Sequence, residues 1–344
     1  MRLAFIGGNG HHYLKGALDD ADVRIDAVAM AGDGHDPEPA RKKAEGMRQS
    51  RDDLVFYNDP EALFEQFRPD IVNVGAVYAF NGDWVARCLE RDIPVVSDKP
   101  IAGTWAQYRR LVELTRGNDR RLVTEFDFRS RAAFRAAQAA VASGDIGQPV
   151  LATAQKSYPF ATRPGWYAER ALYTGTMLWV ASHGIDAIAF VTGMEFARAV
   201  GRQGNITRPD YGTMEDHTVA LFELEGGATG IVHADYLRPP KAPTWGDDRL
   251  RVVGSAGQVE VRDDRCWLLT HEREQTDITD TVRPEPIHRE LLAALRGESA
   301  VLYGTSQSLH LAAVMLAARD AADTGQWQDI EAAAARAVSG THQS

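Results

Sequence analysis

A charged pair at the end of an apolar run is the first group of residues that could take part in catalysis or binding. In the stretch from Ile93 to Gly103, the four apolar residues Ile93–Val96 predict a short strand covered on both faces of a parallel sheet. The strand runs directly into Asp98, Lys99 and Pro100. Open α/β sheets bind their ligands at this end of their strands, so Lys99 is a candidate functional residue. The alternative is a solvated loop lysine.

A second candidate is a histidine in the apolar stretch from Tyr173 to Gly193. The pattern predicts a helix over about Met177–Val191, with Trp179, His183 and Asp186 on one side because their spacings are four and three. Imidazole is the side chain whose ordinary pKa suits proton transfer near neutrality. The alternative is a core histidine bonded to a carbonyl, with the aspartate as a helix-surface partner.

A glycine-rich turn near the N-terminus indicates a phosphate-binding site. A strand is predicted at Arg2–Ile6 and a helical pattern at Tyr13–Leu18, and this strand–turn–helix order presents backbone N–H groups to a phosphate. The fingerprint G-x-G-x-x-G is incomplete, because non-glycine residues hold one or two of its places in either register. The candidate cofactor residues of the turn are Gly7, Gly8, Asn9, Gly10 and His12.

The choice between NAD and NADP stays open in the sequence. A second strand is expected at Val23–Ala31, and Asp33 follows it at about the place where an acidic residue binds the ribose hydroxyls of NAD. The basic run Arg41–Lys43 on the next helix could instead meet a 2′-phosphate, although such runs are usually solvated.

The alternation of elements predicts an α/β protein of two domains. Strands alternate with helices over residues 1–126, which predicts a parallel, doubly wound Rossmann domain. Over residues 127–330, alternating strands with short turns predict an α+β domain with a large, open, mostly antiparallel sheet. A helix is expected at about 305–324, and it could pack back on the first domain. Residues 331–344 are expected to form a frayed tail.

Composition narrows the functional class. The chain has 344 residues, a net charge of −10 and a pI near 5.5, which argues against nucleic acid and anionic membranes as partners. Two cysteines are too few for a disulfide framework and suit a reducing compartment. No apolar run approaches the ~20 residues of a membrane-spanning helix and no signal peptide is evident, so the cytoplasm is the expected location.

Taken together, the motif around Lys99 and the motif around His183 make the sequence resemble the Gfo/Idh/MocA family of nicotinamide-dependent oxidoreductases. Asp98-Lys99-Pro100 is similar to the family's Glu-Lys-Pro motif, with Asp for Glu, and Gly175–Asp186 is similar to its G-G-x-x-x-D-x-G-x-H-x-x-D signature. Two departures stand out. Trp179 occupies the place of the aspartate that often assists the histidine, and Ala76-Val77-Tyr78 stands where the family often has Thr-Pro-Asn beside the nicotinamide.

The resemblance implies hydride transfer between a nicotinamide cofactor, NAD or NADP, and a secondary alcohol or ketone of a sugar, cyclitol or related substrate. His183 would transfer the hydroxyl proton, and Lys99 would orient the hydroxyl and stabilise charge on its oxygen. Ala76, Tyr78 and Asp98 join the cofactor residues, and the family's open sheet implies a dimer or tetramer. The candidate substrate residues are Lys156, Tyr158, Arg163, Trp166, Trp179, Asp186, Asp235 and Tyr236.

Other functions stay open at this point. The altered glycine fingerprint and Trp179 also suit a binding or regulatory member of the family that has lost turnover. A third possibility is transient oxidation by tightly held NAD with no net redox change. A metal hydrolase using His183, His217 or His233 is disfavoured, because the histidines are scattered and no close ligand spacing such as H-E-x-x-H is present. No metal is therefore expected.

Overall fold

The computed structural model describes residues 1–118, 121–298 and 304–339. The chain forms two compact units, one of Met1–Glu125 with Pro286–Ala312 and one of Phe126–Glu285 with Ala313–Ser344. The predicted fold class, a Rossmann domain followed by an α+β domain with a large open sheet, is confirmed.

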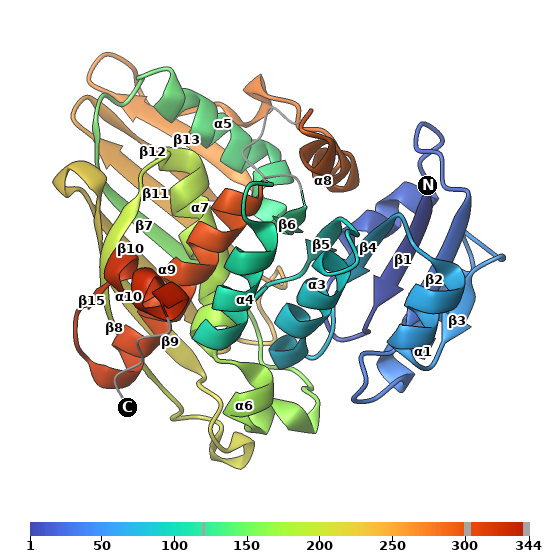
Figure 1. Ribbon diagram of the computed structural model, residues 1–344. Coiled ribbons are helices and arrows are strands. Elements are labelled where there is room, and N and C mark those ends of the chain that lie inside the picture. The colour runs from blue at the N-terminus through green and yellow to red at the C-terminus, as the bar shows by residue number, and fades with distance from the viewer. Residues whose placement is uncertain (119–120, 299–303, 340–344) are drawn as a thin grey trace. The chain divides into compact units, whose positions relative to one another are not determined.

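The first unit contains a six-stranded parallel sheet in the order β3-β2-β1-β4-β5-β6 (Figure 1). Its central strands are apolar and fully buried, because helices cover both faces of a parallel sheet. The chain order reverses between β1 and β4, and such a reversal marks the ligand-binding edge of the fold. The strands are β1 (Arg2–Ile6), β2 (Ala27–Ala31), β3 (Val55–Tyr57), β4 (Ile71–Val74), β5 (Val95–Ser97) and β6 (Leu122–Thr124).

The helix that follows the glycine turn is shorter than a usual Rossmann helix. Tyr13–Leu18 is a single 3₁₀ helix, and Gly16 in its middle lies so close to His288 that an added Cβ would sit 2.5 Å from the ring Nδ1. Glycine also disfavours a long helix. The α-helices of this unit are α1 (Glu38–Met47), α2 (Pro60–Ala62), α3 (Asn81–Leu89), α4 (Trp105–Thr115) and α8 (Ile287–Arg296).

Strand β6 is an edge strand whose free side is closed by hydroxyl groups. The helix α9 (Thr305–Thr324) begins beside it. The backbone N–H of Leu122 donates to Thr305 Oγ1 at 3.0 Å, and that of Thr124 donates to Ser308 Oγ at 2.9 Å. These contacts tie the start of α9 to the first unit, as the sequence led us to consider.

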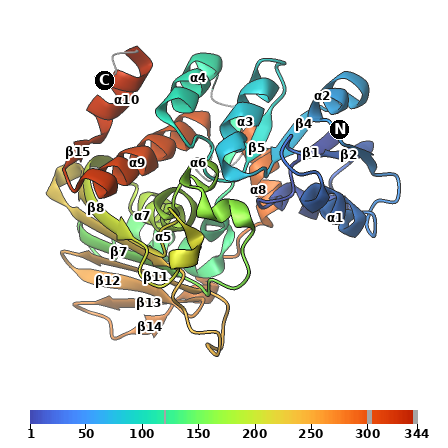
Figure 2. The same cartoon turned by 90° about the horizontal axis from the view of Figure 1, so that it is seen from below.

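The second unit is built on a nine-stranded, mostly antiparallel sheet in the order β14-β13-β12-β11-β7-β10-β9-β8-β15. Helices α5 (Ala132–Ala142) and α7 (Ser182–Thr192) lie against one face (Figure 2). On the other face Val219, Leu221 and Leu269 are each more than a third exposed. The strands are β7 (Pro149–Ser157), β8 (Phe196–Gly204), β9 (His217–Leu224), β10 (Thr229–Asp235), β11 (Asp247–Gly254), β12 (Gly257–Arg262), β13 (Arg265–Thr270), β14 (Thr276–Asp277) and β15 (Gln328–Asp329).

Two parts of the second unit differ from the expectation. Strand β8 was not predicted, and the expected tail from 331 is mostly helix α10 (Ile330–Ser339), whose Ile330, Ala333 and Ala337 are buried. Residues 340–344 of that tail lie outside the described residues. Within the described chain, no helix combines the length and apolarity needed to cross a bilayer.

Candidate functional site

The glycine turn after β1 is held tightly against its own unit. Gly7 has a φ of +84°, and a Cβ there would lie 2.5 Å from Ala76 Cα. A Cβ on Gly10 would lie 2.6 Å from Asp98 Oδ2. The N–H of Gly10 donates to Gly75 O at 2.8 Å. The structure therefore brings the turn, Ala76 and Asp98 together at the carboxyl ends of β1, β4 and β5, as the cofactor prediction requires.

Asp33, the candidate ribose-binding acid, lies just beyond β2 and is 3% exposed. Its Oδ2 accepts hydrogen bonds from Val77 N–H at 2.8 Å and from Asn9 Nδ2 at 3.4 Å, and its Oδ1 accepts from His35 N–H at 3.1 Å. These bonds fix the carboxylate beside the glycine turn and near the segment that begins at Ala76.

His12 points into the protein. Its Nε2 lies 2.8 Å from Gly7 O, and its ring meets Phe5 edge-on with centroids 5.3 Å apart. Burial, helped by the charge of Lys43, lowers the pKa of His12 to about 3, so the ring is neutral at physiological pH. The buried ring of His12 thus holds the turn through the carbonyl of Gly7. Lys43 on α1 holds it at a second point, where its Nζ donates to the carbonyl of Gly10.

Lys99 lies in a buried charged cluster at the end of β5. Its Nζ is 3.5 Å from Asp98 Oδ1, and both side chains are at most 1% exposed. The same carboxylate accepts the N–H of His11 at 2.6 Å and the N–H of Lys99 at 2.8 Å. Burial alone would raise the pKa of Asp98, but the charge of Lys99 and the contacts of His11 outweigh it and hold the pKa below its usual range. Asp98 is therefore a carboxylate that orients Lys99 and the turn.

Glu125 completes this cluster and was not predicted as a functional residue. Its Oε2 accepts hydrogen bonds from Tyr13 N–H at 3.1 Å and from Asn73 Nδ2 at 3.3 Å. Burial and the charge of Asp98 raise the pKa of Glu125 to about 8, although Lys99 opposes the shift. Its position directly after the buried strand β6 was the available signal, since Lys99 was found by the same rule.

In the second unit, His183 lies near the start of α7 and is 7% exposed. Its Nδ1 is 3.2 Å from Asp127 Oδ1. The rings of Phe126 and Phe128 lie 6.3 Å and 5.3 Å from the imidazole, centroid to centroid. Asp127 belongs to the short 3₁₀ helix Asp127–Ser130, so the partner of the histidine comes from a distant part of the sequence.

Asp127 is the start of an ion-pair network. Arg131 Nη2 lies 2.5 Å from Asp127 Oδ2, and Arg131 Nη1 lies 2.9 Å from Asp248 Oδ2. Lys156 Nζ lies 2.9 Å from Asp248 Oδ1. Burial would raise the pKa of Asp127, yet the close approach of His183 and the charges of Arg131 and Lys156 hold it well below its usual range. Asp127 is thus ionised at neutral pH. Lys156, a predicted substrate residue, is engaged in this network.

Trp179 lies among tyrosines. It is hydrogen-bonded to the hydroxyl of Tyr158, which is in turn bonded to Tyr236. The hydroxyls of Tyr236 and Tyr173 are 2.8 Å apart. Burial raises the pKa values of these tyrosines, so their hydroxyls stay protonated. The structure therefore brings together three of the predicted substrate residues, Tyr158, Trp179 and Tyr236.

Asp186 forms a buried ion pair with a residue the prediction did not include. Arg129 Nη2 and Nε lie 2.5 Å and 2.8 Å from Asp186 Oδ1, and both side chains are at most 1% exposed. Burial raises the pKa of Asp186, while Arg129 opposes the shift. The structure thus gives Asp186 a partner inside the second unit rather than an opening to solvent.

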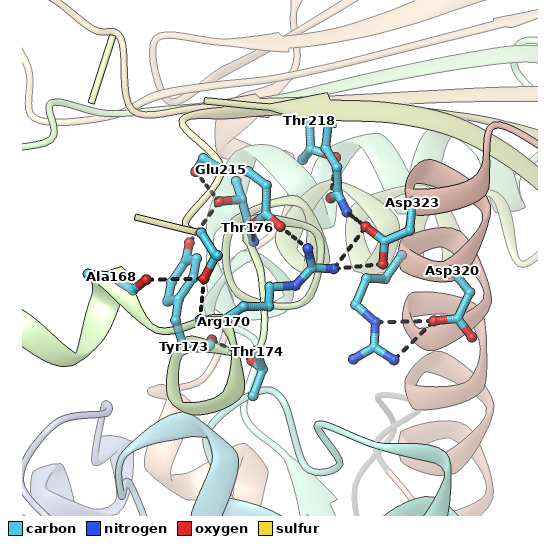
Figure 3. A network of polar contacts seen from close by, with 12 residues as sticks. Ala168, Arg170, Tyr173, Thr174, Thr176, Glu215, Thr218, Asp320 and Asp323 are labelled. Carbon is cyan, nitrogen blue, oxygen red and sulfur yellow. Dashed lines mark hydrogen bonds and ion pairs between the residues drawn. The ribbon is translucent and has the colours of Figure 1, made fainter. Parts of the chain in front are cut away.

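A polar network anchors the segment that leads into the histidine helix (Figure 3). Arg170 forms ion pairs with Glu215 and with Asp323, the latter at 2.9 Å. Glu215 Oε2 accepts the N–H of Thr176 at 3.0 Å. Gly175 has a φ of +113°, a conformation that a Cβ would strain. The glycine of the motif therefore serves the turn into the helix, and the ion pairs hold that turn in place.

The remaining predicted substrate residues lie at the loop ends of β7 and β10. Arg163 lies 5.4 Å from the Tyr158 ring, and Trp166 packs against Tyr167. Asp235 accepts a hydrogen bond from Ser157 Oγ at 2.7 Å. A cavity of about 530 Å³ opens here, lined among others by Phe160, Arg208, Tyr236, Arg238 and Trp245. The described residues contain no group of three or more His, Cys, Asp and Glu side chains placed to hold a metal ion.

Comparison with known proteins identifies both units. The model described as "Oxidoreductase family, NAD-binding Rossmann fold" matches residues 3–126, and the model described as "GFO/IDH/MocA C-terminal domain" matches residues 134–260. The chain belongs to the Gfo/Idh/MocA oxidoreductase family. The resemblance seen in the sequence is confirmed, and with it the expectation of a nicotinamide dinucleotide as the cofactor of the first unit.

Relatives within the family are distant. Myo-inositol 2-dehydrogenase of Thermotoga maritima is 26% identical over 223 residues, which are 64% of this chain and 65% of that protein. The alignment thus spans slightly less than two thirds of that relative. An oxidoreductase structure from Thermotoga maritima matches with a TM-score of 0.86 and 29% identity, over 95% of this chain and 99% of that one. Levoglucosan dehydrogenase in complex with NADH and L-sorbose matches with a TM-score of 0.78 but 14% identity, over 96% of this chain and 98% of that one, so it shows the fold alone.

Proposed function

We propose that this protein is a nicotinamide-dependent dehydrogenase that interconverts a secondary alcohol and a ketone on a polyhydroxylated substrate such as a cyclitol or a sugar. The observation that carries the proposal is Lys99, a lysine 1% exposed at the carboxyl end of β5 in an NAD-binding domain. A buried ammonium at that place can hold a hydroxyl oxygen and stabilise the charge that develops on it. The names of two relatives, myo-inositol 2-dehydrogenase and D-glucoside 3-dehydrogenase, support the substrate class.

The first unit fits a dinucleotide. A glycine turn follows β1 at the point where the strand order reverses, and a carboxylate follows β2. We assign the turn Gly7–Gly10 to the pyrophosphate, Asp33 to the ribose hydroxyls and Ala76–Tyr78 to the nicotinamide side. A carboxylate at Asp33 would repel a 2′-phosphate, so NAD is the expected form. When bound, the nicotinamide supplies the hydride acceptor at its C4.

The protein supplies the proton transfer and the charge stabilisation. As the carbinol C–H bond breaks and its electron pair leaves as hydride, the hydroxyl proton passes to Nε2 of His183 and the C=O bond forms. The substrate is then a ketone and His183 an imidazolium, and a bound nicotinamide would take up the electron pair that leaves as hydride. Lys99 holds the substrate oxygen throughout and stays protonated. In the direction of reduction, His183 returns the proton to the oxygen.

The second unit offers groups for the rest of the substrate. Tyr158 stacks on Trp245, which lines the cavity of about 530 Å³ at the ends of β7 and β10. Trp245 at its rim is 61% exposed and presents a flat face on which the C–H groups of a sugar ring could pack. We also propose that the exposed sheet face with Val219, Leu221 and Leu269 forms a homo-oligomer interface, which light scattering would test.

Cofactor binding followed by turnover tests this function. Purified protein is first checked for retained nucleotide and then titrated with NADH and NADPH by nicotinamide fluorescence. We expect micromolar binding of NADH, at least tenfold weaker binding of NADPH because of Asp33, and NAD reduction with at least one member of a cyclitol and sugar panel. Binding of neither nucleotide by the folded protein would overturn the proposal. NADH binding without turnover of any polyol would favour the non-catalytic alternative.

A further inference from the structure

The aspartate that often assists the histidine in this family is absent from its usual place. Trp179 stands there, four residues before His183, and its side chain is hydrogen-bonded to Tyr158. A neutral imidazole carries one hydrogen, which can lie on either ring nitrogen. A base that takes a proton on Nε2 must carry its hydrogen on Nδ1, so some other group has to select that tautomer.

Asp127 is placed to select it. Its Oδ1 lies 3.2 Å from His183 Nδ1, and its side chain is 17% exposed. The rings of Phe126 and Phe128 border the imidazole and leave its orientation little freedom. The contact is an ion pair rather than an aligned hydrogen bond, and a carboxylate this close favours the ring form with its hydrogen on Nδ1, because it can accept that hydrogen but cannot donate one.

The charges around the pair keep Asp127 ionised. Arg131, one turn later, and Lys156 on β7 are the cations that act on it. Asp248 on β11 contacts both of these cations, and Asp264 reaches Arg131 at 3.4 Å. On the histidine helix itself, Asp186 forms a buried ion pair with Arg129. The three carboxylates outnumber the two cations, so the network favours a positive charge on the imidazole.

We propose that Asp127 is the positioning residue for His183. It replaces, from the segment after β6, the carboxylate that position 179 lacks. It fixes the hydrogen on Nδ1 and stabilises the imidazolium that forms when Nε2 takes the substrate proton. This inference rests on the proposed function and deepens it. Trp179 is correspondingly released from acid–base chemistry and holds the tyrosine hydroxyls of the second unit.

The decisive variant is Asp127→Asn, which keeps the size of the side chain and removes its charge. We expect kcat to fall about 10²-fold, the scale of positioned acid–base catalysis, with NADH affinity unchanged. The acid limb of the kcat/KM profile should move to lower pH, because Arg131 and Lys156 would then face an imidazole without its counter-charge. Asp264→Asn is the matched control, since Asp264 contacts Arg131 but not the histidine. Because Asp264 is 80% exposed and its charge is screened by water, Asp264→Asn should move the acid limb much less than Asp127→Asn does and should leave kcat near the wild-type value.

A purely structural role would give a different pattern. In that case Asp127→Asn would lower the melting temperature and weaken NADH binding while the acid limb stayed in place, and the proposal would be wrong. An Asp127→Asn protein with wild-type kcat and pH profile would contradict it equally. Either result is interpretable only against a wild-type enzyme that turns over, so a second measurement is needed that does not depend on turnover.

That measurement is the ¹⁵N chemical shift of the imidazole nitrogens in the unmutated protein, with His183→Gln used to assign the signals. We expect the neutral ring to carry its hydrogen on Nδ1 and to titrate at higher pH than in Asp127→Asn. A neutral ring with its hydrogen on Nε2 would overturn the inference even if Asp127→Asn failed to fold. Because no substrate is involved, this result also separates a wrong role for Asp127 from a wrong reaction.

Discussion

The charged clusters of the two units both place a basic side chain beside a carboxylate, but they are constructed in opposite ways. In the first unit Lys99 follows Asp98 directly in the chain, and the pair is closed to solvent. In the second unit His183 and Asp127 come from separate elements, and their network reaches solvent through Asp264, which is 80% exposed. A fixed, desolvated cation suits stabilisation of charge on oxygen, whereas a group that gains and loses protons benefits from a polar connection to water.

The largest expected effect comes from removing the fixed cation of the first unit. Lys99→Met keeps the length of the side chain without its charge, and kcat should fall about 10²–10³-fold, as when an oxyanion-stabilising group is lost. NADH titration measures whether the cofactor site survives. Lys42→Met, the same change at an exposed position of α1, is the control. A Lys99→Met enzyme with wild-type kcat would show that Lys99 does not stabilise the charge on the substrate oxygen.

An intermediate effect is expected from Glu125, whose ionisation makes the free energy of unfolding depend on pH. Its pKa is about 8 in the folded protein against an ordinary 4.5, so the folded state holds a proton that the unfolded state has released. The free energy of unfolding must therefore fall as pH rises from about 4.5 to 8. Glu125→Gln should remove this contribution, on the order of a few kcal/mol, and flatten the decline of the melting temperature over that range.

The control for this test is Glu113→Gln, at an exposed position of α4. Its melting temperatures should follow the wild type at every pH. If Glu125→Gln followed the wild type as well, the carboxyl would be ionised in the folded protein, and Lys99 would face two negative charges instead of one. The first cluster would then carry an excess of negative charge, as the second cluster does, in spite of its burial.

The smallest expected effect is that of salt, which should separate the clusters by their exposure. Screening acts on charges near water, with a Debye length of about 10 Å at 0.1 M. Because the second network is partly exposed and carries an excess of negative charge, 0.5 M NaCl should move the acid limb of kcat/KM to lower pH by a few tenths of a unit. The pH dependence due to Glu125, followed by melting temperature, should stay in place. Equal shifts in both readouts would remove the distinction.

The same contrast explains what the sequence revealed about the site. Asp98 and Lys99 adjoin at the end of a buried strand, so position in the pattern was enough to single them out. The parallel sheet followed from strands that alternate with helices over residues 1–126. Such features can be predicted from the local sequence, because side chains on one face of a strand or helix recur with a fixed period.

Features that depend on tertiary contacts could not be predicted in this way. Asp127 meets His183 only once β6 and α7 are folded, and nothing in the helix pattern indicates a distant carboxylate. Glu125 directly follows β6, but its hydrogen bonds from Tyr13 and Asn73 exist only in the folded sheet. Strand β8, with Arg198, Arg202 and two glycines, lacks the apolar alternation that indicates a strand, since it pairs near the edge of the sheet. Burial and partners, not residue type, define these positions.

The hydroxyl closure of β6 has a consequence for how the protein behaves among its own copies. An exposed strand edge is a template for pairing with another chain, and proteins avoid aggregation by covering or interrupting such edges. Here Thr305 and Ser308 occupy the N–H groups of Leu122 and Thr124. A chain that ended before α9, whether by early termination or by proteolysis, would present these donors to its neighbours. The first turn of α9 thus protects against aggregation a sheet whose last strand, β6, lies far earlier in the chain.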